Sequence, residues 1–221
     1  NTLYELGKGS YSNLSDLFVC LKTNGIADSR IKDLINIDYF SDYGDIKYLL
    51  NYFDVFMKFY KNKKYLSQFK KDKAFEFGID FDVLRKHCGS ETVKTFMRID
   101  SKAIIDELAG NFDGKVSLKE KLLSRYEVLG YMDIVDKKYA GYCFVEDLNV
   151  DYSPKVKLYA LANGNTIPVK ISKKIFKQNP VKRGDIVKVT NQHKEPKKKK
   201  IDGQWQKIDE QEWWVTEYQI C

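Results

Sequence analysis

The sequence has few of the residues that build metal centres and disulfide frameworks. Its 221 residues include two histidines, His87 and His193, and four cysteines. The cysteines lie far apart and form no Cys-x-x-Cys pair: Cys20, Cys88, Cys143 and Cys221. A zinc site needs ligands at close, regular spacing, so this distribution excludes one and we expect no cofactor. Widely spaced thiols are typical of reduced cysteines, and the sequence therefore predicts a cytoplasmic protein.

Long hydrophobic runs are missing as well. No stretch approaches the roughly 18 apolar residues that can span a membrane, and no signal peptide opens the chain. The sequence therefore predicts no membrane partner. The chain begins with Asn1 instead of methionine, which predicts a piece of a longer protein.

Catalytic motifs are also scarce. No histidine stands in a recognisable arrangement with a nucleophile. The segment "LGKGS" (Leu6–Ser10) is too short for a phosphate-binding loop and lacks the Lys-Ser pair that would follow. We therefore expect no catalytic residue and no enzyme activity in this chain. A hydrolase that uses two paired carboxylates stays an alternative, because such a pair has no sequence signature.

Charge is abundant but unevenly distributed. The chain carries a net charge of +7. Residues 152–200 hold 14 basic residues against two acidic ones, Asp185 and Glu195, whereas residues 201–221 hold one lysine and five acidic residues. A folded region this basic favours an anionic polymer as partner. A lysine-rich surface that serves only solubility is the alternative.

Residues 1–126 have the spacing of amphipathic helices. In residues 12–22, Leu14, Leu17, Phe18 and Leu21 fall on one helical face, with Ser12 as the expected N-cap. The same period predicts further helices over these segments: residues 28–37, 44–60, 81–88, 90–99, 101–110 and 117–130. The first region is therefore predicted to be all helical.

From about Tyr131 the apolar period changes to two. Alternation predicts five short strands: residues 141–148, 155–161, 166–171, 183–190 and 212–220. A short helix over residues 172–179, capped by Ser172, stands between the third and fourth strands. This order is that of an OB-fold, a small five-stranded β-barrel. The predicted fold class is α+β, with a helical region followed by this barrel.

The segment "KEPKKKKIDGQWQKIDEQEWW" (Lys194–Trp214) combines four consecutive lysines with all three tryptophans. If Asp202-Gly203 closes a two-residue hairpin, Lys200 pairs with Trp205 and Lys198 with Lys207, on one shared face. An OB-fold binds single strands with this loop and with its second and third strands. The predicted nucleic-acid-binding residues are Tyr142, Phe144, Lys157, Tyr159, Lys170, Lys188, Lys197, Lys198, Lys199, Lys200, Trp205 and Lys207.

Two other interpretations of the same residues stay open. Lys200 can pack on Trp205 as a cation–π pair that needs no ligand. The barrel can also use its aromatic face to hold a protein partner. Trp213 and Trp214 are adjacent and face opposite sides of their strand, which predicts that one of them belongs to the core.

Two segments, residues 11–50 with Ser15, Asp16 and Phe18, and residues 121–135 with Glu127 and Gly130, resemble parts of the C-terminal region of the bacterial DNA polymerase III alpha subunit. Residues 11–50 resemble a helix that the family enters through an aromatic-Ser-x-x-Asp-Phe pattern, followed by an "LI…FD…G" element. The matching residues are Tyr11, Ser15, Asp16, Leu17, Phe18, Leu34, Ile35, Tyr39, Phe40 and Gly44. Residues 121–135 are similar to the family's "E…LG-aromatic" sequence, through Glu127, Leu129, Gly130 and Tyr131.

The resemblance implies three regions. Residues 1–72 would be the trailing part of a helix-hairpin-helix type domain, residues 73–126 a helical connector, and residues 127–221 an OB-fold that binds nucleic acid. The family's catalytic aspartates would lie before Asn1, so this part would not polymerise DNA itself. The implied partners are single-stranded template DNA, the primer-template duplex and the rest of the polymerase chain. A sliding clamp or another replisome protein stays an open partner, because the family's clamp-binding peptide has no clear match.

Overall fold

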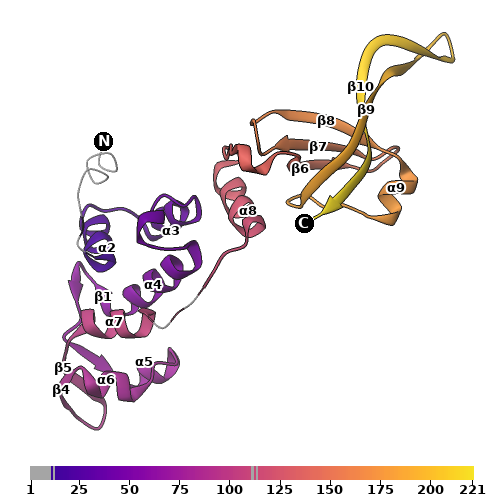
Figure 1. Ribbon diagram of the computed structural model, residues 1–221. Coiled ribbons are helices and arrows are strands. Elements are labelled where there is room, and N and C mark those ends of the chain that lie inside the picture. Colours follow the sequence, from indigo (N-terminus) through magenta and orange to yellow (C-terminus); the bar gives the residue numbers. More distant parts are fainter. Residues whose placement is uncertain (1–10, 12, 111, 113) are drawn as a thin grey trace. The chain divides into compact units, whose positions relative to one another are not determined.

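The structure is a computed structural model, and it describes residue 11, residues 13–110, residue 112 and residues 114–221 (Figure 1). The chain forms two compact units, residues 1–117 and residues 118–221. These units differ from the three regions that the sequence predicts, because one continuous core holds both sides of the expected boundary at residue 72. The "LGKGS" segment and the expected cap Ser12 lie outside the described residues.

The first unit contains the helices predicted over residues 12–60 and 101–110. They are α2 (Leu14–Thr23), α3 (Asp28–Asn36), α4 (Ile46–Phe59) and α7 (Ser101–Gly110), with a short turn of 3-10 helix, η1 (Ser41–Tyr43). Asn13 caps α2, since its side-chain oxygen accepts the backbone N–H of Asp16 at 2.9 Å. The rings of Phe18 and Phe53 are fully buried with their centres 5.0 Å apart, so α2 and α4 share one aromatic core.

The prediction that the first region is all helical is wrong. Two small sheets follow α4: β1 (Tyr60–Lys61) with β2 (Lys64–Tyr65), and a three-stranded sheet in the order β3-β5-β4. Its strands are β3 (Gln68–Lys70), β4 (Cys88–Glu91) and β5 (Thr95–Ile99), and two short helices accompany them, α5 (Lys71–Glu76) and α6 (Phe81–Lys86).

The segment predicted as a helix over residues 90–99 instead contributes to β4 and β5. It is rich in β-branched residues, and its buried side chains, Phe96 and Ile99, pack into the core from an extended chain. Arg98 lies between them at φ 51° and interrupts the alternation of the strand. A short apolar segment of this kind has no clear period, which is why helix and strand are easily confused there.

Helix α8 (Leu118–Leu129) belongs to the second unit. It begins directly after Ser117, as predicted, and ends at Gly130, whose φ of 76° suits a residue without a side chain. Leu122 on α8 is fully buried and packs in a cluster with Phe144 and Ile186. A turn of 3-10 helix, η2 (Lys137–Tyr139), then leads into the strands.

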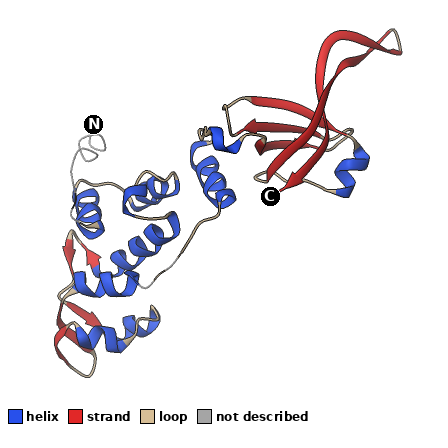
Figure 2. Cartoon of the chain, viewed as in Figure 1, coloured by secondary structure: helices blue, strands red, loops and turns tan. Residues whose placement is uncertain are grey.

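Five strands of the second unit close into a ring in the order β10-β8-β7-β6-β9 (Figures 1 and 2). They are β6 (Tyr142–Asn149), β7 (Lys155–Ala160), β8 (Thr166–Ile171), β9 (Ile186–Ile201) and β10 (Gln204–Ile220). The expected helix is α9 (Lys173–Gln178), whose cap Ser172 accepts the backbone N–H of Ile175 at 3.3 Å. The chain is thus a mixed helix and sheet protein, as predicted.

The ring closes through two kinds of pairing around β10. Its parallel partner is β8, with Trp213 opposite Val169 and Val215 opposite Ile171. Its antiparallel partner is β9, which in turn pairs with β6 through residues 186–188. The side chains that point into the ring form a second core: Val145, Val156, Val169, Val187 and Val215. The alternating valines and isoleucines of these strands therefore supply the interior, as the period of two predicts.

Strands β9 and β10 continue past the ring as a two-stranded arm (Figure 1). Asp202 and Gly203 turn the chain at the tip, with φ values of 50° and 84°. Positive values at both central residues are typical of a type I′ turn, which favours Asp-Gly. The strands are much longer than predicted, because the lysine-rich segment is itself part of β9.

Candidate nucleic-acid interface

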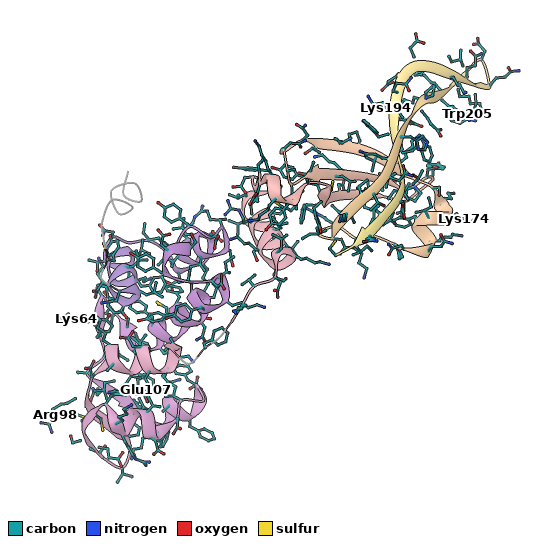
Figure 3. All side chains as sticks on the ribbon, in the orientation of Figure 1. Lys64, Arg98, Glu107, Lys174, Lys194 and Trp205 are labelled. Carbon is teal, nitrogen blue, oxygen red and sulfur yellow. The ribbon has the colours of Figure 1, made fainter. Side chains whose placement is uncertain are left out.

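The register of the arm is the one that the sequence predicts. Lys200 lies opposite Trp205, and Lys198 lies opposite Lys207. These four side chains share one face, while Lys199 lies opposite Gln206 on the other face. Trp205 is 70% exposed, so much of its large apolar side chain faces solvent near the tip of the arm (Figure 3).

A groove of about 870 Å³ lies along this arm, between the ring and Trp205. Three parts of the second unit line it: the loop between β6 and β7, strands β7 and β8, and the β9–β10 arm. Its basic and aromatic lining residues are Tyr152, Lys155, Lys170, Lys197, Lys198, Trp205 and Trp213. The groove therefore brings together four of the predicted residues, namely Lys170, Lys197, Lys198 and Trp205.

Two of the groove lysines are held by carboxylates. The ammonium group of Lys170 lies 2.6 Å from one oxygen of Glu212 and 2.8 Å from the other, and 5.4 Å from the centre of the Trp214 ring. The indole N–H of Trp214 donates to the same carboxylate at 3.2 Å. Glu212 is thus fixed in place by two partners, and the positive charge of Lys170 is largely compensated.

Lys197 is paired at the surface of the groove. Its ammonium group donates to Glu210 at 2.8 Å, and this hydrogen bond raises the pKa of Lys197. For the other two groove lysines, Lys155 and Lys198, the described part of the chain offers no ion pair. The groove therefore combines two ammonium groups without an ion-pair partner among the described residues with two that are paired with carboxylates.

Phe144 and Tyr159 are not available for stacking, contrary to the prediction. They lie opposite each other on β6 and β7 and are buried, in a cluster with Leu122 of α8 and with Met132. The centre of the Tyr126 ring lies 5.3 Å from that of Phe144. The prediction is wrong because α8 covers this face of the sheet. The alternation of side chains along a strand does not indicate whether a helix from elsewhere in the chain packs on one of its faces.

The other predicted residues on the ring lie outside the groove lining. Tyr142 lies opposite Lys188, whose ammonium group stands 5.5 Å from the centre of its ring. Lys157 is exposed and lies 3.0 Å from Glu146, which raises the pKa of Lys157. Lys199, Lys200 and Lys207 lie on the arm but do not line the groove. The predicted set is therefore split between the groove, the arm, a separate Tyr142–Lys188 pair, Lys157 beside Glu146, and the buried pair of Phe144 and Tyr159.

The three tryptophans have different surroundings. Trp213 is half-buried, packs against the core of the ring and lines the groove, and the ammonium group of Lys194 lies 4.7 Å from its ring centre. Trp214 faces the other side of the strand, where its indole N–H donates to Glu212. Trp213 and Trp214 are both half-buried. Among the described residues no cation contacts the ring of Trp205, which stays open for a ligand.

Several lining residues were missed by sequence reasoning. Lys155 lies directly opposite Lys170 because four residues, 161–164, separate the paired Ala160 and Asn165, and a tight turn counted at Asn163–Asn165 would place Lys155 opposite another residue. Tyr152 and Ser153 come from an irregular loop whose position follows from no local pattern. The sequence shows Glu210 and Glu212 only as negative charges, whereas the structure pairs them with two of the groove lysines.

The described residues hold no group of three histidine, cysteine, aspartate or glutamate side chains placed to bind a metal ion. Within the same residues, no helix has both the length and the apolar character needed to cross a membrane. Comparisons of the chain with protein-family models, with curated proteins and with solved structures find no match.

Proposed function

We propose that the second unit is an OB-fold that binds single-stranded nucleic acid in the groove. Counted along the chain, its strands pair in the order first, second, third, fifth and fourth, and the fourth pairs again with the first. A helix, α9, separates the third strand from the fourth. Both features are those of the OB-fold, and they support the assignment.

The observation that carries the proposal is the composition of the groove. OB-folds bind oligonucleotides against their second and third strands and the loops joining strands one to two and four to five. The groove is lined from the same parts: Tyr152 from the first of these loops, Lys155 and Lys170 from the strands, and Trp205 from the β9–β10 arm. Rings that alternate with ammonium groups are typical of sites for single strands.

Binding energy would come from stacking and from phosphate charge. A base on the exposed ring of Trp205 contributes about 1–3 kcal/mol. Since Glu210 and Glu212 compensate two of the four groove lysines, between two and four phosphates would be neutralised. The logarithm of the binding constant should then fall against the logarithm of salt concentration with a slope of about −1.4 to −2.8, at about −0.7 per phosphate.

The resemblance to the polymerase III alpha subunit supplies the biological setting of this proposal. In that setting the bound strand is template DNA during replication, and the chain positions it without contributing catalytic groups or a cofactor. The protein would work in the cytoplasm together with the rest of a polymerase chain.

A second candidate function rests on the two carboxylates. A groove that mixes Glu210 and Glu212 with lysines and with the exposed rings of Tyr152 and Trp205 is also suited to a protein partner. Such binding would depend far less on salt than phosphate binding does.

The test is fluorescence anisotropy of a labelled 12-nucleotide oligo-dT strand, titrated with the chain at several salt concentrations. We expect salt-dependent binding that Trp205→Ala weakens by about 5- to 150-fold, in line with the loss of one stacked base. Lys198→Gln should reduce the salt slope, whereas Lys174→Gln on α9, outside the groove, is the matched control (Figure 3). Absence of binding at low salt would refute the proposal and favour the protein partner.

A further inference from the structure

We propose that the first unit binds an acidic peptide with one large apolar side chain, in a hollow beside the outer edge of strand β3. The hollow has a volume of about 380 Å³ and combines an apolar floor with three lysines. It is called the β3 hollow below. Because it belongs to the first unit, it is separate from the groove and does not depend on the function proposed for the second unit.

The floor of the β3 hollow is formed by Leu66, Phe69 and Phe77. Phe69 is buried, the other two side chains are half-buried, and all three pack against the core of the unit. The ring centres of Phe69 and Phe77 lie 6.4 Å apart. An apolar side chain that enters the hollow would therefore extend an existing core and leave water, which favours binding. The volume is at the low end of the range for ligand sites, about 300–1,000 Å³, and suits a single large side chain.

The charged groups of the β3 hollow have one sign. Lys61, Lys70 and Lys73 line it, and no carboxylate of a described residue does. Lys73 is paired with Glu76, whereas Lys61 and Lys70 are exposed and form no ion pair with any described residue. Charge complementarity therefore favours a peptide that carries acidic residues on both sides of its apolar one.

Strand β3 offers the peptide an open edge. It is an outer strand of its sheet, and among the described strands it pairs with β5 alone. Gln68 and Lys70 line the hollow from β3, and Thr95 lines it from β5, opposite Lys70. An outer strand can pair with an extended peptide, whose backbone supplies affinity while a pocket beside the edge selects a side chain. The short β3 therefore suits a short extended segment.

The floor of the hollow decides between a peptide and a nucleic acid. A base needs the open face of a ring to stack on. Phe69 is buried, and the ammonium groups of Lys58 and Lys73 lie 5.4 Å and 5.8 Å from the ring centre of Phe77. A phosphate backbone would contact the lysines and leave the apolar floor uncovered. An acidic peptide with an apolar side chain uses both.

The test uses the whole chain and a labelled octapeptide in which two aspartates stand on each side of one phenylalanine. Fluorescence anisotropy measures its binding and that of the same peptide with alanine in place of phenylalanine. The variant Lys61→Gln, Lys70→Gln removes the two unpaired cations of the hollow. The matched control, Lys64→Gln, Lys94→Gln, removes two exposed lysines of the same unit that do not line it (Figure 3 labels Lys64). Circular dichroism verifies that both variants fold.

We expect the alanine peptide to bind about 10- to 100-fold more weakly, in line with the loss of one buried aromatic side chain. The hollow variant should bind the phenylalanine peptide about fivefold more weakly near 0.1 M salt, and the control should stay within about twofold of the parent. Trp205→Ala, in the groove of the second unit, should leave the affinity for the peptide unchanged.

Three results would overturn the proposal. The first is that the chain does not bind the phenylalanine peptide at low salt. The second is equal binding of the two peptides, which would show that the lysines attract any polyanion, nucleic acid included. The third is that the control variant or Trp205→Ala weakens binding as much as the hollow variant does, which would place the peptide elsewhere. Oligo-dT binding reports on the groove alone, so its outcome leaves this test interpretable.

Discussion

The Lys170–Glu212 pair offers a strong test of the groove, because substituting Lys170 and substituting Glu212 should change the affinity for oligo-dT in opposite directions. Glu212→Gln keeps the size of the side chain and an oxygen that accepts the indole N–H of Trp214, but removes the negative charge. Lys170→Gln removes the positive charge instead. Each change breaks the same contact, with ammonium-to-carboxylate distances of 2.6 Å and 2.8 Å.

The cost to stability should be similar in the two variants. The side chains are 25% and 16% exposed, so the pair lies between a surface pair, at about 0–1 kcal/mol, and a buried one, at about 3–5 kcal/mol. We expect each variant to lose about 1–2 kcal/mol. For a unit of this size that loss lowers the melting temperature by about 5–10 °C, which differential scanning calorimetry can measure.

The effect on binding should differ in sign. Removing the carboxylate relieves a repulsion of about 1 kcal/mol with a phosphate about 6 Å away, so Glu212→Gln should bind oligo-dT about fivefold more tightly. Lys170→Gln should bind about fivefold more weakly, with a salt slope smaller by about 0.7. If both variants shift the affinity in the same direction, the change reflects structure and not groove charge, and the reasoning is refuted.

Two further predictions concern the second unit. Phe144→Ala should lower the free energy of unfolding in urea by about 3–5 kcal/mol, because the side chain is fully buried beneath α8. The fraction of the variant that stays folded should still bind oligo-dT. A loss of binding without a loss of stability would show that Phe144 belongs to the binding face. Burial raises the pKa of the Cys143 thiol to about 11, so iodoacetamide at pH 8.5 should modify it more than tenfold more slowly than the exposed Cys221, as read by mass spectrometry. Because the folded protein favours the neutral Cys143 thiol, this thiol contributes to the free energy of unfolding below about pH 9. That contribution is lost as the pH rises toward 11. Equal labelling of both thiols would contradict this burial.

Local chemistry made the arm predictable. Asp202-Gly203 is a strong turn signal, and a two-residue hairpin leaves one register for its flanking residues, so the pairing of Lys200 with Trp205 follows by counting. Ser172 and the period of the strands located α9 and the ring in the same way. In the first region, the same reasoning is wrong over residues 90–99, where a short apolar segment without a clear period forms strands instead of the predicted helix.

The sequence by itself determined the elements whose signals lie within a few residues: the long helices, the tight turns, the alternation of the strands and the excess of lysine. Only the tertiary structure decided which of those residues line the groove and which are buried. Helix α8 buries Phe144 and Tyr159, and the β6–β7 loop brings Tyr152 to the groove. Glu212 meets Lys170 because β10 and β8 pair across 42 residues of sequence. Such contacts depend on the packing of distant segments against each other, and no local pattern of side chains encodes that packing.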